Sequence, residues 1–278
     1  MNKQNNKQNK LRRMGIAAAL TVILCMGLLL SVTAAPVAHN WYCVHVKDHV
    51  QPTAPGELAF IEDLDGFYID HRHAAPDAED KVIYLTFDVG YENGNVSKVL
   101  DVLKAADATG AFFILSNVIT SAPELVERML AEGHTVCNHT AHHKDMTRLD
   151  DAAFLGELRE LETLCLERLG QAPAAYYRPP QGRFTKENLL CAKTNGYKTI
   201  FWSFAYPDWD NDRQMTPEKA KRILLDNVHN GEVMLLHPTS ATNATVLGEV
   251  LAELRGMGYR FGRLDELTGG ASCDGSAS

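Results

Sequence analysis

Apolar and polar residues change their spacing repeatedly between residues 81 and 261, and this change predicts alternating strands and helices. Short apolar runs rich in β-branched and aromatic residues predict seven strands, at 82–87, 111–115, 134–137, 174–178, 198–202, 233–236 and near Tyr259. Apolar residues spaced three and four apart predict helices at 94–106, 122–131, 151–169, 186–194, 216–227 and 242–256. Strands that alternate with helices across short connections form parallel sheets, so the sequence predicts an α/β domain with an open sheet or a barrel.

The longest predicted helix, at 151–169, shows its pattern most clearly. Phe154, Leu158, Leu161 and Cys165 recur at intervals of three and four residues. These side chains share one face of the helix, which is expected to be buried. The helix at 216–227 begins with Thr216-Pro217, a pair typical of an N-cap and a first turn.

The N-terminus has a targeting pattern instead. A polar stretch with five basic residues ends at Arg13, and an uncharged apolar run of 22 residues follows at 14–35. This order, with small residues near Val32-Thr33-Ala34, is typical of a signal peptide. Because such a run is also long enough to cross a bilayer, residues 1–36 are predicted to be a cleaved signal peptide or a retained membrane anchor. Both interpretations predict an exported, extracytoplasmic protein.

The other boundaries follow from composition. Residues 37–79 contain Pro, Asp, His and Gly without clear periodicity, which predicts a linker and a short N-terminal extension that packs on the main domain. Residues 80–268 carry the regular pattern and form the predicted main domain. Residues 269–278 are small and polar, and we expect a flexible tail there.

Charge and cysteine content argue against two classes of protein. The formal net charge is −8, and the first 36 residues hold five basic residues and no acidic one, so the rest of the chain carries −13. A surface this acidic repels phosphate backbones and argues against nucleic acid as a partner. Apart from Cys25 there are five cysteines, an odd number without a Cys-x-x-Cys pair. We interpret them as isolated thiols rather than a disulfide framework.

Polar side chains gather at one end of the predicted strands. Asp88 ends the first strand, His139 follows the third, Arg178 ends the fourth, His237 follows the sixth, and Asp208 lies in the loop after the fifth. The carboxyl ends of parallel strands meet at one rim, where barrel enzymes hold their active sites. The sequence therefore predicts that these residues form one site.

Two histidines near this rim, His139 and His143, are four residues apart. If the segment turns helically, both rings share one face and can bind one metal ion. His142 is the competing ligand, although its spacing of three from His139 fits the pattern less well. The pair predicts a metal site whose metal the sequence does not name.

The other residues of the set suit acid–base chemistry. A carboxylate at the end of a buried strand, such as Asp88, is costly unless it is paired or used, and Arg178 can pair with it. His237 titrates near neutral pH, and Asp208 can hold its imidazolium, which suits a general acid. Two prolines restrict the turn at 178–182, so the Gln181 backbone N–H could point at a developing oxyanion.

Five ordered motifs connect these residues to a known family. They are Thr86-Phe87-Asp88-x-Gly90-Tyr91, His139-Thr140-x-x-His143, Arg178-x-Pro180-x-Gly182, Asp208-Trp209 and Leu236-His237. Over residues 80–268 the chain resembles the polysaccharide deacetylase family, also called the NodB-homology domain or carbohydrate esterase family 4. The resemblance implies a distorted (β/α)7 barrel and hydrolysis of an N-acetyl amide in a glycan.

The resemblance also implies a role for each residue of the site. Asp88 would be the base that activates water, Arg178 the residue that orients it, His237 the acid that protonates the leaving amine, and Asp208 the residue that tunes His237. Gln181 would offer its backbone N–H to the oxyanion. The substrate pocket would be lined by Tyr91, Trp209 and Leu236, and a divalent metal ion, zinc or another first-row ion, would be bound by His139 and His143.

One position departs from the family pattern. Family members usually carry a second Asp directly after the base as the third metal ligand, and this chain has Val89 there. Valine offers no ligand atom, which implies an incomplete metal site that binds more weakly or is completed by water, substrate or another side chain. The lactyl carboxylate of muramic acid is one candidate.

Further segments resemble one branch of the family, the delta-lactam-biosynthetic de-N-acetylases of the spore cortex (PdaA-like proteins), which also lack the second Asp. The segments are Tyr91-Glu92-Asn93-Gly94-Asn95, Phe201-Trp202-Ser203, Asp208-Trp209 and His237-Pro238-Thr239-Ser240. This implies deacetylation of N-acetylmuramic acid in peptide-free peptidoglycan, after which the freed amine closes a lactam.

The alternatives are deacetylation of N-acetylglucosamine in peptidoglycan or chitin-like glycans, and a wall-binding module without activity. Asp88 and His237 argue against the module, because binding alone needs no acid–base pair.

Overall fold

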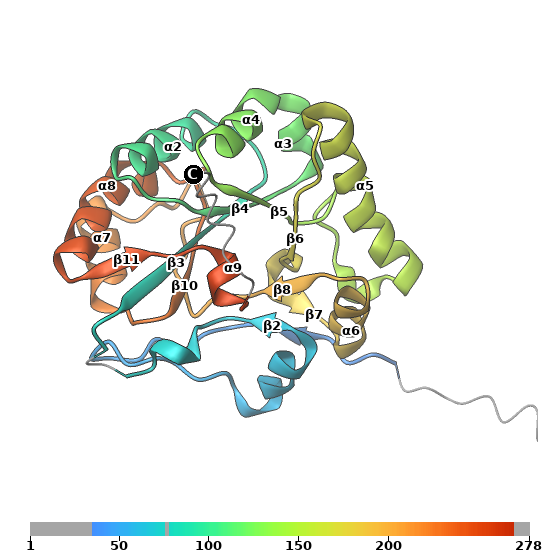
Figure 1. The fold of residues 1–278 in the computed structure, drawn as a ribbon, viewed down its shortest axis with the longest axis horizontal. Helices are drawn as coiled ribbons and strands as arrows, with labels where there is room; N and C mark the ends of the chain where they lie inside the picture. Colours follow the sequence, from blue (N-terminus) through green and yellow to red (C-terminus); the bar gives the residue numbers. More distant parts are fainter. Residues whose placement is uncertain (1–34, 76–77, 270–278) are drawn as a thin grey trace, which may run out of the picture. The chain divides into compact units, whose positions relative to one another are not determined.

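A curled sheet of parallel strands forms the centre of the structure, a computed structural model that describes residues 35–75 and 78–269 (Figure 1). The order of its strands is β2-β8-β6-β5-β4-β3-β10-β9, with β11 beside β3. The strands are β2 (Gly66–Phe67), β3 (Lys81–Val89), β4 (Ala111–Ile114), β5 (Thr135–Asn138), β6 (Ala174–Tyr177), β8 (Lys198–Ile200), β9 (Phe204–Ala205), β10 (Glu232–Leu236) and β11 (Tyr259–Phe261). The seven predicted strands are all present, and the ladders that join them are parallel.

The two ends of this strand order come from one run of chain. β8 and β9 lie at or next to opposite ends of the order, yet only residues 201–203 separate them. A connection this short spans about 14 Å at most, so the sheet must curl until its edges approach each other. The result is an α/β half-barrel built on a curled parallel sheet, which confirms the predicted fold, a distorted (β/α)7 barrel.

Helices surround the strands (Figure 1). They are α2 (Val96–Ala105), α3 (Ser116–Ser121), α4 (Pro123–Ala131), α5 (Asp151–Leu169), α6 (Lys186–Thr194), α7 (Pro217–Asp226), α8 (Ala241–Gly256) and α9 (Leu264–Leu267). α5 and α6 have the predicted bounds, because the side chains of Asp150 and Thr185 cap their first turns. The six residues of α3 are too few to show a helical period, and the sequence pattern does not predict this helix.

The sheet separates two apolar layers. Side chains alternate along β3, so Phe87 and Val89 face the helices in the larger cluster, while Val82 and Tyr84 belong to the cluster on the inner side. Because the period is two, Asp88 points to the inner side as well. The cysteines of the described residues, Cys43, Cys137, Cys165 and Cys191, are free thiols.

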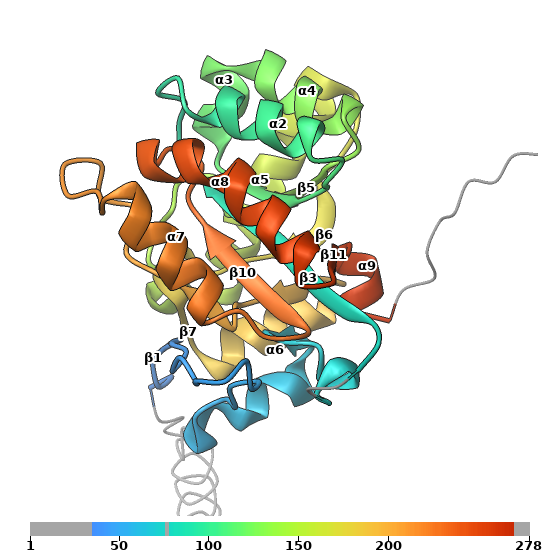
Figure 2. The same ribbon diagram turned by 90° about the vertical axis from the view of Figure 1, so that its left-hand side faces the viewer.

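Residues 37–75 pack against the side of the half-barrel formed by β7 (Arg183–Phe184), β8 and α6 (Figures 1 and 2). They contain β1 (His39–Asn40), the 3-10 helices η1 (Gly56–Leu64) and η2 (His71–His73), and β2. β1 pairs antiparallel with β7. Leu58 and Ile61 of η1 are buried in one cluster with Phe184. Packed elements therefore occupy a range for which the sequence predicts in part a linker, and the boundary at residue 79 stays a prediction.

The predicted export segment at 1–36 and the predicted tail at 269–278 lie outside the described residues, except at their inner ends. From Val37 onward the described residues belong to one compact unit. Within the part of the chain that the structure describes, no helix combines the length and the hydrophobicity needed to cross a membrane.

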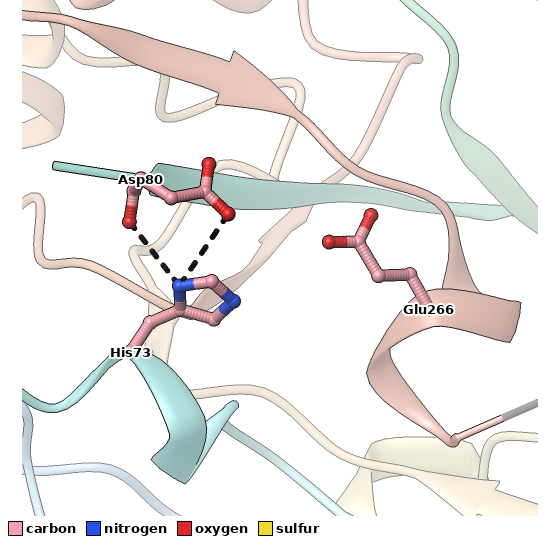
Figure 3. Close-up of side chains that lie close together, drawn as sticks. All are labelled: His73, Asp80 and Glu266. Atoms are coloured by element: carbon pink, nitrogen blue, oxygen red, sulfur yellow. Dashed lines mark hydrogen bonds and ion pairs between the residues drawn. The ribbon is translucent and has the colours of Figure 1, made fainter. Parts of the chain in front are cut away.

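An ion-pair network joins the extension to the last helix. His73, Asp80 and Glu266 converge on one point (Figure 3). Arg260 donates to both oxygens of Asp80, at 2.6 and 2.8 Å, and to Glu266 at 2.9 Å. The three side chains are of types that bind metals, but both carboxylates are already paired with the Arg260 guanidinium. We therefore interpret the cluster as a structural tie between η2, the start of β3 and α9.

Helix α5 allows a direct test of the packed face. Phe154, Leu158, Leu161 and Cys165 are buried, as their spacing predicts, while Leu166 is 53% exposed. Leu161→Ala should lower the free energy of unfolding by about 2–5 kcal/mol, because it removes buried methyl groups and leaves a cavity. Leu166→Ala is the matched control in the same helix, with an expected change within about 0.5 kcal/mol. Urea unfolding measures both, and equal losses would contradict the assigned face.

Candidate active site

Asp88 and His237 lie side by side at the carboxyl ends of β3 and β10. The parallel register pairs Leu236 with Phe87, so the next residues along the two strands, His237 and Asp88, are also neighbours. Neighbouring strands are about 4.8 Å apart. The charge of each residue accordingly shifts the pKa of the other. A carboxylate and an imidazole therefore lie within reach of one bound substrate.

The guanidinium of Arg178 binds Asp88 on the inner side of the curled sheet. Arg178 follows β6 and is fully buried. Its Nη1 donates to Asp88 Oδ1 at 2.8 Å, and its Nη2 donates to Thr86 Oγ1 at 2.9 Å. Its Nε and Nη2 also donate to the carbonyls of Ile200 and Phe201, at 3.0 and 3.1 Å. These bonds give the guanidinium one orientation, which in turn fixes the Asp88 carboxylate.

The Asp88 carboxylate stays ionised despite its burial. Only 9% of the residue is exposed, and burial alone would raise its pKa. The charge of Arg178, with smaller contributions from His139 and His237, outweighs burial and holds the pKa of Asp88 below its ordinary value. Asp88 is therefore a fixed carboxylate that can accept a proton.

Asp208 fixes the opposite side of the His237 ring. Its Oδ1 accepts from His237 Nδ1 at 2.7 Å, and its Oδ2 accepts from the His237 backbone N–H at 2.7 Å. Asn243 Nδ2 also donates to Oδ2, at 2.6 Å. Burial would lower the pKa of His237, but the hydrogen bond and the charge of Asp208 raise it above its ordinary value. Because Nδ1 is committed to Asp208, Nε2 is the nitrogen left to exchange a proton with a substrate.

His139 and His143 meet across a turn rather than along a helix. Thr140 and His143 have φ angles of 76° and 54°, so the helical segment expected from the spacing of four is wrong. Asn138 stabilises the turn, because its Oδ1 accepts from the Thr140 N–H and its Nδ2 donates to the Leu158 carbonyl, at 2.8 and 2.9 Å. The two imidazole rings still lie 5.1 Å apart between centres.

The His139 ring presents an unprotonated nitrogen to the site. Its Nδ1 donates to the Arg178 carbonyl at 2.9 Å, so Nε2 keeps its lone pair and lies 3.6 Å from Asp88 Oδ2. Burial lowers the pKa of His139 to about 4 and also lowers that of His143, so both rings are neutral at neutral pH. Two neutral imidazoles beside a carboxylate are a donor set that fits a divalent metal ion.

His142, the competing ligand, is held by α5 instead. Its Nδ1 lies 3.1 Å from Glu157 Oε1, and its Nε2 lies 3.3 Å from Glu160 Oε1. Its backbone N–H donates to Glu157 Oε2 at 2.9 Å. His142 therefore ties the turn to α5, where with Glu157 and Glu160 it forms a separate group of metal-binding side-chain types. His139 and His143 are the candidate metal ligands beside Asp88.

The loop after Arg178 carries Gln181 in a left-handed conformation, with φ 57° and ψ 13°. Gly182 follows with φ 65°. A left-handed non-glycine residue costs about 1–3 kcal/mol, and such residues cluster at functional sites. The predicted oxyanion donor therefore lies in a strained turn, three residues after the arginine that orients the base.

Two of the predicted pocket residues are aromatic and exposed beside the site. Trp209 is 58% exposed, and its ring centre lies 6.2 Å from that of His237. Tyr91 is 45% exposed, and its hydroxyl accepts a hydrogen bond from Asn211. This bond joins the loop after β3 to the loop after β9.

The third predicted pocket residue, Leu236, lies on the other face of the sheet. Its side chain is buried in the helix-facing cluster with Phe87, its partner across the ladder. Successive residues of a strand point to opposite faces, so Leu236 and His237 diverge. The pocket assignment of Leu236 is therefore wrong by one position, and Leu235 points to the same side as His237.

Two residues that hold the site together leave little signal in the sequence. Thr86 is part of the first motif, but only the structure reveals that its hydroxyl accepts from Arg178. A polar residue inside an otherwise apolar strand is the clue that marks it. Asn243 lies 35 residues after Asp208, and only the fold brings its amide to that carboxylate.

Known proteins are similar in sequence to this chain over most of its length. The family model described as Polysaccharide deacetylase matches residues 75–200. Peptidoglycan-N-acetylmuramic acid deacetylase PdaA of Bacillus subtilis is 36% identical over 252 residues, which cover 88% of this chain and 94% of PdaA. Peptidoglycan-N-acetylglucosamine deacetylase PgdA of Listeria monocytogenes is 30% identical over 68% of this chain, which spans 39% of PgdA.

Solved structures agree with these matches. The structure of Bacillus subtilis PdaA, a family 4 carbohydrate esterase, has a TM-score of 0.77 at 36% identity and covers 83% of this chain and 96% of that one. A family 4 carbohydrate esterase from Bacillus anthracis has a TM-score of 0.67 at 33% identity and covers 84% and 97%. The chain therefore belongs to the polysaccharide deacetylase family, carbohydrate esterase family 4, and is a hydrolase.

Proposed function

We propose that the protein hydrolyses the N-acetyl amide of N-acetylmuramic acid in peptidoglycan strands that have lost their peptides, and that the freed amine then closes the muramic delta-lactam of spore cortex. One observation carries the chemistry. A carboxylate held by an arginine and an imidazole held by a carboxylate lie side by side at one rim. The similarity to the muramic acid deacetylase PdaA, over 88% of the chain, supports the choice of sugar.

The proposed substrate lies outside the cell membrane, so the function requires export. Residues 1–36 carry the pattern of an export signal, five basic residues before an apolar run. Whether cleaved or kept as an anchor, this segment would deliver the enzyme to the cell wall or the forespore. The glycan strands of the wall are the partner in this proposal.

Asp88 acts as the general base. Its carboxylate takes a proton from the water that attacks the acetyl carbonyl carbon. Arg178 keeps the carboxylate ionised before this step, because its charge lowers the pKa of Asp88. The same hydrogen bonds keep the carboxyl group aimed while it carries the proton.

His237 acts as the general acid. When the C–N bond breaks, the imidazolium gives its Nε2 proton to the leaving amine, and acetate and the free amino sugar result. Asp208 stabilises the imidazolium through its bond to Nδ1. The proton that Asp88 removes from water balances the proton that His237 donates, so the reaction consumes only water and substrate.

The carbonyl oxygen gains negative charge when water adds, and the chain offers two ways to stabilise that charge. Gln181 presents its backbone N–H from the strained loop after Arg178. His139 and His143 would hold a divalent metal ion, which supplies Lewis-acid polarisation of the carbonyl. Val89 offers no ligand atom and packs in the helix-facing cluster, so the remaining ligands of such an ion would be water, substrate oxygens such as the lactyl carboxylate, or another side chain.

The acetyl methyl group would contact Leu235 and Trp209. Leu235 points to the same side of β10 as His237, and Trp209 presents an exposed ring beside that histidine. Tyr91 extends this apolar surface from the opposite loop. Aromatic rings offer large apolar faces that pack well against sugar rings.

Two alternatives keep some support. Deacetylation of N-acetylglucosamine would use the same residues, and the 30% identity to a deacetylase of that sugar favours it in part. A wall-binding module without activity would need neither the Asp88–Arg178 pair nor the His237–Asp208 pair, so both pairs argue against it.

Peptide-free glycan strands given to the purified protein should release acetate, and mass spectrometry should place the lost acetyl group on muramic acid. Asp88→Asn keeps the shape of the side chain but removes the base, so release should slow by a factor on the order of 10² or more. His237→Ala should have a similar effect. Loss of acetyl groups from glucosamine alone would favour the other sugar, and no release with any added divalent ion would sink the deacetylase proposal.

Asp208→Asn should move the alkaline limb of kcat/KM to lower pH by about one unit. Asp208 raises the pKa of His237, so the acid stays protonated to a higher pH and activity falls only as the pH passes that value. Removing the charge lowers the pKa, and activity is then lost earlier. Asp210→Asn is the matched control, because Asp210 lies in the same loop and pairs with Arg213. An alkaline limb that both variants leave in place would mean that His237 is not the acid.

His139→Ala and His143→Ala should each weaken zinc binding at least about tenfold, since even the outer partners of metal ligands contribute that much. His142→Ala is the control within the same turn, because its ring pairs with Glu157 and Glu160. Its zinc affinity should stay within about twofold of wild type. Calorimetry on the metal-free protein gives the three values. Similar losses in all three variants would refute the ligand assignment.

A further inference from the structure

The N-terminal extension places Trp41 directly on the loop that carries Gln181. β1 pairs with β7, with Asn40 opposite Arg183, and the two lie next to each other in Figure 2. The Trp41 backbone N–H continues this pairing, because it donates to the Gly182 carbonyl at 2.8 Å. Residues 39–41 therefore form the outer wall of the loop.

Trp41 also holds the chain that follows β8. Its side chain is buried, and its Nε1–H donates to the Trp202 carbonyl at 2.8 Å. Its ring packs on those of Phe201 and Tyr68, with centres 4.8 and 5.0 Å apart. A buried indole with its N–H paired has one favourable position. Trp41 therefore links the loop at 181–182 to the chain at 201–202.

Gly182 demonstrates how closely the loop is held. A Cβ atom there would lie 2.8 Å from Cη2 of Trp202 and 3.3 Å from Cβ of Trp41. The first of these distances is shorter than real Cβ contacts, so any other residue would force the Trp202 ring to move. Gln181, directly before it, keeps its left-handed conformation only where the surroundings enforce it. The two tryptophans are part of those surroundings.

Arg178 holds the same chain from the inner side. Its Nε and Nη2 donate to the carbonyls of Ile200 and Phe201, and the next carbonyl, of Trp202, accepts from Trp41. The arginine that orients the base and the tryptophan of the extension thus bind consecutive carbonyls of one segment. A shift of Trp41 would move the oxyanion loop relative to the base.

We propose that Trp41 is a positioning residue for the oxyanion-binding N–H of Gln181, and that residues 39–41 belong to the catalytic unit. The inference rests on the deacetylase function proposed above. The family model starts at residue 75 and so leaves this segment out. The match to PdaA covers 88% of this chain, so a continuous match cannot begin after residue 36 and must include the segment. If these residues belong to the catalytic unit, a related deacetylase should retain them, and the match to PdaA meets that expectation.

Trp41→Phe tests this role while it keeps an aromatic ring in the cluster. The variant loses the indole N–H and with it the bond to the Trp202 carbonyl. The kcat of acetate release should fall about tenfold with KM unchanged, because the oxyanion exists only after water has added. Both limbs of the pH profile should stay in place, because Asp88 and His237 keep their partners.

Tyr68→Phe is the matched control. Tyr68 is buried in the same cluster, and its hydroxyl accepts from the Ala54 N–H at 3.0 Å rather than from the loop. Like Trp41→Phe, Tyr68→Phe loses one buried hydrogen bond, so the melting temperatures of the two variants should drop by similar amounts. The kcat of Tyr68→Phe should stay within about twofold of the wild-type value. Hydrogen exchange of residues 178–184 should be faster in Trp41→Phe than in Tyr68→Phe.

A failure of the positioning role can be distinguished from a failure of the deacetylase proposal. If the wild type releases acetate and both variants have the same kcat and the same exchange rates, the positioning role is overturned while the deacetylase proposal stands. If the wild type releases no acetate from any glycan, both proposals are overturned. A selective loss of kcat in Trp41→Phe, with matched stability, supports the role.

Discussion

The buried ion pair between Arg178 and Asp88 is the interaction on which the site depends. Taking a charge out of water costs several kcal/mol per ion, so such a pair persists only where its donors and oxygens have partners. Here the guanidinium donates hydrogen bonds to Asp88, to the Thr86 hydroxyl and to the carbonyls of Ile200 and Phe201. Loss of either partner would leave the other charge buried alone. The constraint that stabilises the pair therefore also sets the direction and the charge of the proposed catalytic base.

The backbone of the same arginine connects the other parts of the site. Its carbonyl accepts from His139 Nδ1 at 2.9 Å, which selects the tautomer with a lone pair on Nε2. Its N–H donates to the Asn138 carbonyl at 3.0 Å, at the start of the turn that carries both histidines. Its chain then enters the Gln181 loop. The proposed base, the candidate metal ligand and the proposed oxyanion donor are thus positioned from one residue, so substitutions among them should not have additive effects on the rate.

Local patterns predicted the regular elements, and long-range contacts decided the rest. α5 has the predicted bounds because its cap and its apolar face are both local. Asp88 and His237 could be placed on one rim because parallel strands share a direction. The turn at 139–143 depends on a bond from Asn138 to Leu158, which spacing does not reveal. Leu236 marks a second limit, since a shift of one residue along a strand reverses the face of every side chain.

The extension was the least predictable part, because its two-residue strands are too short to show a period and its 3-10 helices lack the 3.6-residue period of an α-helix. Its position accounts for one of the two strained turns of the site. The turn at 139–143 is held by α5, inside the regular domain, and the turn at 181–182 is held from outside by Trp41. Electrostatic catalysis needs its donors in place before the charge develops. A boundary at residue 80 keeps the base, the acid and the ligands together, but it separates them from the outer wall of the oxyanion loop. The regular pattern therefore defines the fold, whereas the catalytic unit that we propose extends beyond it to residues 39–41.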